Sequence, residues 1–201
     1  SIFHPWGGGI RELCERGFLC GTVSEEKAFR LCPAFTPMEE RDALLEQTRR
    51  YFTNYGPASI RDAAYYFDTS QAEIKKRLAR LPVEVAECEG QRLFSLHSGR
   101  MPEQAIPDCL LLAGFDPLVL GYEKKQSIFL PQEYLRGIFS LSGIVMPPVL
   151  LHGSAAGRWK HSGKRLFVTQ FRPFSREERG FVETAAAQLW GKAVQPVFQD
   201  A

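Results

Sequence analysis

Apolar residues recur at helical spacing in three consecutive segments in the middle of the chain. They predict a first helix over residues 38–54, which Gly56-Pro57 ends, and a second helix that begins after Ser59. A third helix follows at once, capped by Thr69 or Ser70. The short step between the second and third helices is typical of a helix-turn-helix.

Alternating apolar and polar residues predict a β-hairpin directly after these helices. Residues 83–87 and 92–96 alternate on either side of Glu89-Gly90, a pair that favours a tight turn. Three helices and a hairpin within residues 38–98 therefore predict a winged-helix domain, with the hairpin as its wing.

Weaker patterns lie on both sides of this domain. A short amphipathic helix near residues 10–14 and two strands, 18–23 and 28–31, predict that residues 1–37 are the remnant of a preceding winged-helix module. Residues 99–201 predict a small β-rich domain, whose strands are expected at 144–146, 149–151, 155–160 and 165–171. A capping box at Ser175 and Glu178 begins its closing helix. The predicted fold class is α+β: a winged-helix module followed by a small β-rich α+β domain.

Composition narrows the function classes only a little. The 201 residues are 44% hydrophobic and 24% charged, as is typical of soluble globular proteins, and the net charge is only +2. The five cysteines are widely spaced without a CxxC pair, which excludes a zinc ribbon and favours reduced thiols in a cytoplasmic protein. No apolar run approaches the ~18 residues of a membrane span. The histidines form no metal-ligand pair, so neither a metal nor a cofactor is expected.

The third predicted helix carries the first candidate for DNA contact. Its apolar residues share one side, so Lys76 and Arg80 point the opposite way, with Arg77 on the flank. In a winged-helix domain this basic face would be the recognition helix in the major groove. The alternative is an ordinary solvated helix face.

The predicted wing is acidic, which is unfavourable for contact with phosphates. Glu84, Glu87 and Glu89 stand against a single basic residue, Arg92. A role of the module in binding another protein therefore stays open.

The densest positive charge lies in the predicted β-rich domain. Arg158, Lys160, Lys164 and Arg165 flank a probable hairpin turn and could hold phosphates, although a solvated turn is the alternative. Strand alternation places Trp159 on the opposite face, so we expect it to point inward.

Two features of the same half resemble chemical sites only superficially. The segment from Gly157 to Lys164 is not a phosphate-binding loop, because five residues separate its glycines and Arg165 replaces the Ser or Thr that would hold magnesium. Asp116 could be a lone catalytic acid, but an Asp before Pro favours hydrogen bonds to backbone amides at a turn.

Three segments taken together resemble a known family. They are NYGPASIRDAAYYF (54–67) with the basic helix that follows, LLAGFDPLVLGYEKK (111–125) and SGIVMPPVLLHGSAAGRWK (142–160). In this order, over roughly residues 10–191, they resemble the winged-helix family that includes the azinomycin-resistance DNA glycosylases, which unhook interstrand crosslinks and excise alkylated purines. The resemblance implies tandem winged-helix modules and a C-terminal β-domain bound around double-stranded DNA.

The catalytic signature of the resembled family does not occur in this sequence. That signature is a Gln-x-Gln or Gln-x-Asp pair, and none of the ten glutamines here has Gln or Asp two positions later. The chain begins at Ser1, and we expect it to be the interior of a longer protein whose catalytic pair lies further towards the N-terminus. The leading hypothesis is the DNA-binding portion of such a protein, without a catalytic residue of its own. The alternatives are a winged-helix transcription regulator and a protein-interaction module.

Overall fold

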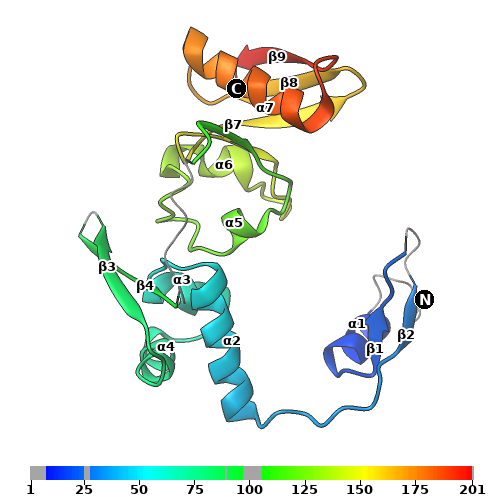
Figure 1. Ribbon diagram of the computed structural model, residues 1–201, viewed down its shortest axis with the longest axis vertical. Helices are drawn as coiled ribbons and strands as arrows, with labels where there is room; N and C mark the ends of the chain where they lie inside the picture. Colours follow the sequence, from blue (N-terminus) through cyan, green and yellow to red (C-terminus); the bar gives the residue numbers. More distant parts are fainter. Residues whose placement is uncertain (1–7, 25–27, 89, 97–105, 201) are drawn as a thin grey trace. The chain divides into compact units, whose positions relative to one another are not determined.

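The computed structural model describes residues 8–24, 28–88, 90–96 and 106–200 (Figure 1). The chain divides into two compact units, Ser1–Asp42 and Ala43–Ala201. None of the helices in these described ranges is both long and apolar enough to cross a membrane.

Before Glu40, the described residues of the first unit form a helix and a short hairpin. Helix α1 (Gly8–Glu15) ends before Gly17, whose φ of +77° glycine adopts without steric cost. Strands β1 (Leu19–Gly21) and β2 (Phe29–Leu31) pair antiparallel. The predicted helix and strands are therefore present, with shorter strands than expected.

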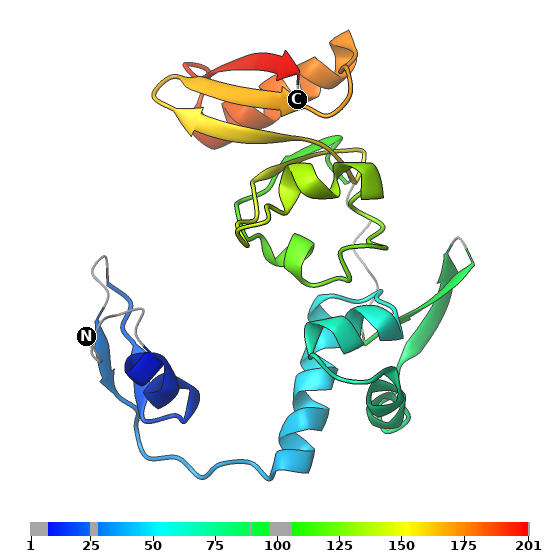
Figure 2. The same cartoon turned by 180° about the vertical axis from the view of Figure 1, so that it is seen from behind.

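Three helices open the second unit, as predicted. Helix α2 (Glu40–Asn54) crosses the boundary between the units, and α3 (Ile60–Tyr66) and α4 (Gln71–Leu78) follow (Figure 2). Ser59 and Asp62 form a complete capping box at the start of α3, and the Ser70 hydroxyl accepts a hydrogen bond from the amide of Glu73 at 3.2 Å. These caps explain why two helices begin so close together.

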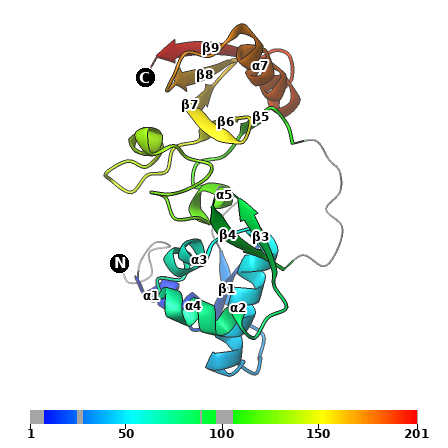
Figure 3. The ribbon, with the colours of Figure 1, turned by 90° about the vertical axis from the view of Figure 1, so that its left-hand side faces the viewer.

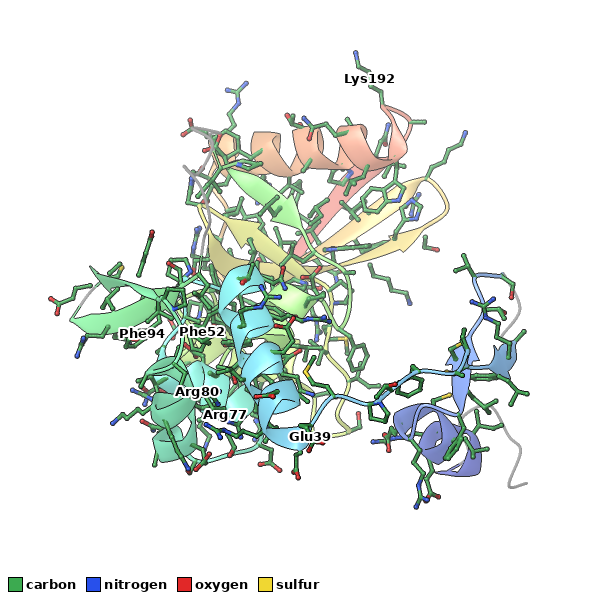
Figure 4. The ribbon with its side chains drawn as sticks, turned by 60° about the horizontal axis from the view of Figure 1, so that its bottom comes forward. Glu39, Phe52, Arg77, Arg80, Phe94 and Lys192 are labelled. Atoms are coloured by element: carbon green, nitrogen blue, oxygen red, sulfur yellow. The ribbon has the colours of Figure 1, made fainter. Side chains whose placement is uncertain are left out.

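The predicted hairpin follows α4 and packs against α2. Its strands are β3 (Glu84–Cys88) and β4 (Gln91–Ser95). Phe94 on β4 meets Phe52 of α2 edge to face, with ring centroids 6.3 Å apart; both residues are labelled in Figure 4. Phe52 is completely buried and belongs to the core that α2, α3 and α4 share.

A five-stranded sheet forms the rest of the second unit's framework (Figure 3). Its strands are β5 (Cys109–Leu111), β6 (Pro148–Leu151), β7 (Ser154–Ser162), β8 (Arg165–Gln170) and β9 (Gln195–Asp200), in that order. The first four pair antiparallel, whereas β8 and β9 are parallel. A parallel pair needs a crossover, which α7 (Arg176–Trp190) provides.

Helix α7 covers one face of this sheet. Val182 and Ala186 of the helix are fully buried, together with Leu166 and Val168 of β8. The indole of Trp159 packs against the same core, and its Nε1 donates a hydrogen bond to the carbonyl of Leu112 at 2.8 Å. The prediction that Trp159 points inward is confirmed.

One predicted strand is wrong. Residues 144–146 lie outside the strands, and Val145 makes only an isolated bridge with Phe139. The segment bonds back to residues 138–140 instead: the Met146 amide donates to the Ile138 carbonyl at 2.8 Å, and the Ser140 amide donates to the Ile144 carbonyl at 2.9 Å. Val145 is instead buried in a small core beneath three short helices: α5 (Pro117–Leu120), η1 (Gln132–Tyr134) and α6 (Leu135–Ile138).

Candidate nucleic-acid interface

Of the three DNA-binding residues predicted on the third helix, Lys76 and Arg77 lie on α4, whereas Arg80 follows the helix, which ends at Leu78. Lys76 and Arg80 are exposed, whereas the side chain of Arg77 is only 13% exposed. Figure 4 labels Arg77 and Arg80. Glu73, one turn earlier, lies 3.6 Å from the Lys76 ammonium and 4.0 Å from Arg77. The outer face of α4 is therefore basic but partly neutralised by its own acid.

A groove on another side of the same helices collects more positive charge. It has a volume of about 360 Å³ and lies among the start of α3, the start of α4 and strand β4. Arg61 comes from α3, Lys75 from α4 and Arg92 from β4; Ser59, Gln71 and Gln91 add polar groups. We call this the three-element groove. All of its lining residues lie in the described part of the chain, and none of them is acidic.

The described acids of the predicted wing lie on the strand that does not line the three-element groove. Glu84 and Glu87 belong to β3, whereas the three-element groove is lined by β4. Glu87 pairs in register with Arg92, and Glu84 pairs with Ser95 on the opposite face of the hairpin. Glu89 lies outside the described residues. Glu87 therefore lies beside the basic residue of β4, and only Glu84 is on the other face of the hairpin.

The second predicted cluster gathers on strands β7 and β8. In the register of the sheet, Arg158 lies opposite Thr169, Lys160 opposite Phe167 and Ser162 opposite Arg165. Alternation therefore places Arg158, Lys160 and Arg165 on one face, turned away from α7. Lys164 lies in the two-residue turn, after Gly163 with its φ of +58°. Three of the four predicted residues thus share one surface.

A shallow groove of about 450 Å³ runs over this surface. Besides Arg158 and Lys160, it is lined by Phe167 and by residues that the sequence analysis did not select, among them Met146, Thr169 and Gln199. The Arg158 Nη1 donates a hydrogen bond to the carbonyl of Gly137 at 3.3 Å. His161 does not belong to this surface, because its ring stacks on Trp190 with centroids 4.8 Å apart.

A further groove of the second unit holds none of the predicted DNA-binding residues. Its volume is about 590 Å³, and Tyr51, Tyr55, Tyr66 and Phe67 form an aromatic wall. Burial raises the pKa of Tyr51, so its hydroxyl stays protonated and donates a hydrogen bond to the carbonyl of Gly121 at 2.7 Å. This aromatic cluster is thus part of the packing between α2, α3 and the segment after α5.

Neither a catalytic acid nor a metal centre emerges from the described residues. Asp116 caps α5: its carboxylate accepts hydrogen bonds from the amide of Leu118 at 2.9 Å and of Ala113 at 3.3 Å. The structural role predicted for Asp116 is confirmed. Within the described ranges, no group of three or more His, Cys, Asp or Glu side chains could hold a metal ion.

The fold places the chain among mixed α+β proteins that are built like a DNA glycosylase. The solved DNA glycosylase AlkZ of Streptomyces sahachiroi superposes with a TM-score of 0.77 at 22% identity, over 100% of this chain and 59% of that one. The family model for "DNA glycosylase AlkZ-like" matches residues 14–191, so the chain belongs to the AlkZ-like DNA glycosylase family.

A curated relative agrees with this membership. The interstrand DNA cross-link repair glycosylase of Streptomyces sahachiroi is 28% identical over an alignment of 200 residues. The alignment covers 92% of this chain and 54% of the relative. The chain thus spans about half the length of the relative that it matches.

Proposed function

We propose that this chain is the DNA-binding portion of a DNA glycosylase that acts on alkylated or crosslinked purines. In this proposal α2, α3, α4 and the β3–β4 hairpin form a winged-helix domain, and double-stranded DNA is the partner. One observation carries the proposal: Arg61, Lys75 and Arg92 converge from three separate elements on one groove whose lining has no acid among its described residues. A protein that binds a duplex needs such converging cations, because contacts with phosphates supply most of its affinity.

The arrangement supports a specific mode of docking. Helix α4 enters the major groove, where the small exposed Ala72 and Ala79 allow a close approach. Lys75 and Lys76 then reach the two phosphate backbones that border the groove, and Arg92 holds the wing beside one of them. Glu84 lies on the other face of the hairpin, whereas Glu87 is the cross-strand neighbour of Arg92, so the wing adds little net positive charge to this interface.

No residue of the chain is assigned to bond cleavage. The sequence lacks the Gln-x-Gln or Gln-x-Asp pair of the family, and the curated relative is nearly twice as long. An alkylated purine is positively charged and leaves readily, so an enzyme gains most by holding the duplex in place and stabilising charge at the sugar. The role of this chain is the first of these two tasks.

The test is binding of the purified chain to a random duplex at increasing salt. Charge reversal of Arg61, Lys75 and Arg92 to Glu is compared with reversal of three exposed basic residues elsewhere: Arg41, Arg176 and Lys192. We expect the first variant to bind at least tenfold more weakly, with a salt slope reduced by about 2–3, since each phosphate contact contributes ~0.9. Equal weakening of both variants would contradict the docking mode. Absence of binding at low salt would contradict DNA binding by this chain.

The outer face of α4 needs a separate variant. Reversal of Lys76 and Arg80 to Glu tests whether the recognition helix uses this face as well as the three-element groove. We expect a smaller loss than for the groove variant, because Glu73 already neutralises part of the charge on this face. A larger loss would move the centre of the interface to the outer face of α4.

A further inference from the structure

The face of strands β7, β8 and β9 that is turned away from α7 has an unusual composition. We call it the open face. It is formed by alternate residues of the three strands, in three cross-strand rows that the register defines. Three of its nine residues are basic, Arg158, Lys160 and Arg165, and none of the nine, all of which are described, is acidic. By contrast, α7 fills the opposite face with buried apolar side chains.

Two of the three residues in the middle row of the open face are apolar. Phe167 lies between Lys160 on β7 and Val197 on β9, and Val197 is 38% exposed. Met146 borders the same groove from the loop before β6. The row before it contains Arg158 and the row after it contains Arg165, each about 7 Å from Phe167 along the strands. An aromatic ring with cations on both sides is therefore built into the sheet.

Two polar side chains that line the groove are held in place by a hydrogen bond to each other. Gln199 Nε2 donates a hydrogen bond to Thr169 Oγ1 at 3.0 Å. This bond fixes the amide of Gln199, whose carbonyl oxygen can then accept a hydrogen bond from a ligand. The groove volume, about 450 Å³, lies within the range of sites for small molecules.

We infer that the open face binds an unpaired nucleotide of the DNA, with its base stacked on Phe167 and the phosphates on either side held by Arg158, Lys160 and Arg165. The inference rests on the proposed DNA binding and adds a second, chemically different subsite to it. Phosphate contact alone would explain the cations but not the presence of Phe167 and Val197 in the row between Arg158 and Arg165. A base inside a duplex is already stacked on both sides, so only an unpaired base offers Phe167 a free face.

The test compares two duplexes of equal length, one fully paired and one with a single unpaired 2-aminopurine. Stacking on an aromatic ring quenches the fluorescence of 2-aminopurine. The chain is expected to bind the second duplex more tightly and to quench its signal. Phe167→Leu should lower affinity for the second duplex by at least about fivefold, the lower end of the range for one stacked base, and leave affinity for the paired duplex unchanged.

Matched variants separate stacking from folding. Phe18→Leu makes the same change at an exposed phenylalanine outside the open face and should have no effect. Phe167→Tyr keeps a stacking ring and should retain both quenching and preference. If Phe167→Leu binds the unpaired duplex as tightly as the unsubstituted chain, the inference is wrong while the proposed function stands. If the unsubstituted chain binds neither duplex, both are wrong.

Discussion

The carboxylate of Asp62 accepts a hydrogen bond from the backbone amide of Glu123, 61 residues later in the sequence, at 2.9 Å. This bond uses Oδ1, while Oδ2 accepts hydrogen bonds from the amide of Ser59 at 2.9 Å and from its hydroxyl at 2.6 Å. One side chain thus caps α3 and also holds the segment that follows α5.

Loss of this carboxylate should destabilise the second unit more than loss of the cap alone. Ser59→Ala removes only half of the capping box and should cost about 1 kcal/mol. Asp62→Ala also leaves the Glu123 amide without its acceptor, and we expect a loss of about 2–3 kcal/mol in urea unfolding at pH 7. Equal losses for the two variants would show that the bond to Glu123 contributes nothing.

The hydroxyl of Tyr51 makes the other testable link between α2 and the segment after α5. Tyr51 is 2% exposed, and its hydroxyl bonds to the Gly121 carbonyl. Tyr51→Phe should lower the free energy of unfolding by about 1–2 kcal/mol, because a buried carbonyl loses its donor. Tyr65→Phe, at a ring that is 44% exposed, is the control and should have no measurable effect.

The pair formed by Arg172 and Glu178 predicts a dependence of stability on pH. The Arg172 guanidinium, 2.6 Å away, lowers the pKa of Glu178 from 4.5 to about 2. Because the pKa is lower in the folded state, the charged pair stabilises the fold above pH 4.5 and loses this contribution as the pH falls from 4.5 to about 2.

Glu178→Gln isolates that contribution, since glutamine can still complete the capping box with Ser175. We expect the variant to be less stable than the unsubstituted chain by about 1 kcal/mol at pH 7, and the difference to shrink progressively below pH 4.5. Unfolding in urea at pH 7, 4 and 3 measures it. A difference that stays constant over this range would contradict the role of the charge.

Two glycines in the second unit should respond oppositely to alanine. A Cβ at Gly157 would lie 2.6 Å from the backbone oxygen of Thr169, which cannot rotate away. Gly157→Ala should therefore cost about 1–3 kcal/mol and lower the melting temperature. Gly180 lies within α7 and has no atom within 4 Å of an added Cβ, so Gly180→Ala should stabilise by up to about 1 kcal/mol. A harmless Gly157→Ala would mean that β7 and β8 can separate locally.

Local signals predicted the helices and hairpins well. A helix cap and the apolar spacing of a helix each depend on residues that are near one another in the sequence. The structure accordingly contains helices that begin after Ser59, Ser70 and Ser175. The strand expected at 144–146 failed because this segment bonds back to residues 138–140 in a tight loop, and β9 was missed because its parallel partner lies beyond a whole helix.

The candidate interface was predictable only in part. Arg158 and Lys160 are two residues apart in one strand, so alternation was enough to place them on one face, whereas the position of Arg165 beside them follows from the register of β8. Arg61, Lys75 and Arg92 come from three elements, and nothing local indicates that they share a groove. The same limit applies to Gln199, which reaches Thr169 only through the parallel pairing of β9.

The order of the five-stranded sheet has a consequence for how the protein is made. Its strands lie side by side in the order in which the ribosome produces them, so each new strand finds its partner already at the growing edge. Strand β9 is the exception, because it can pair with β8 only after the whole of α7 has been synthesised. During that interval β8 presents an unpaired edge, and any delay there exposes a short template for association between nascent chains.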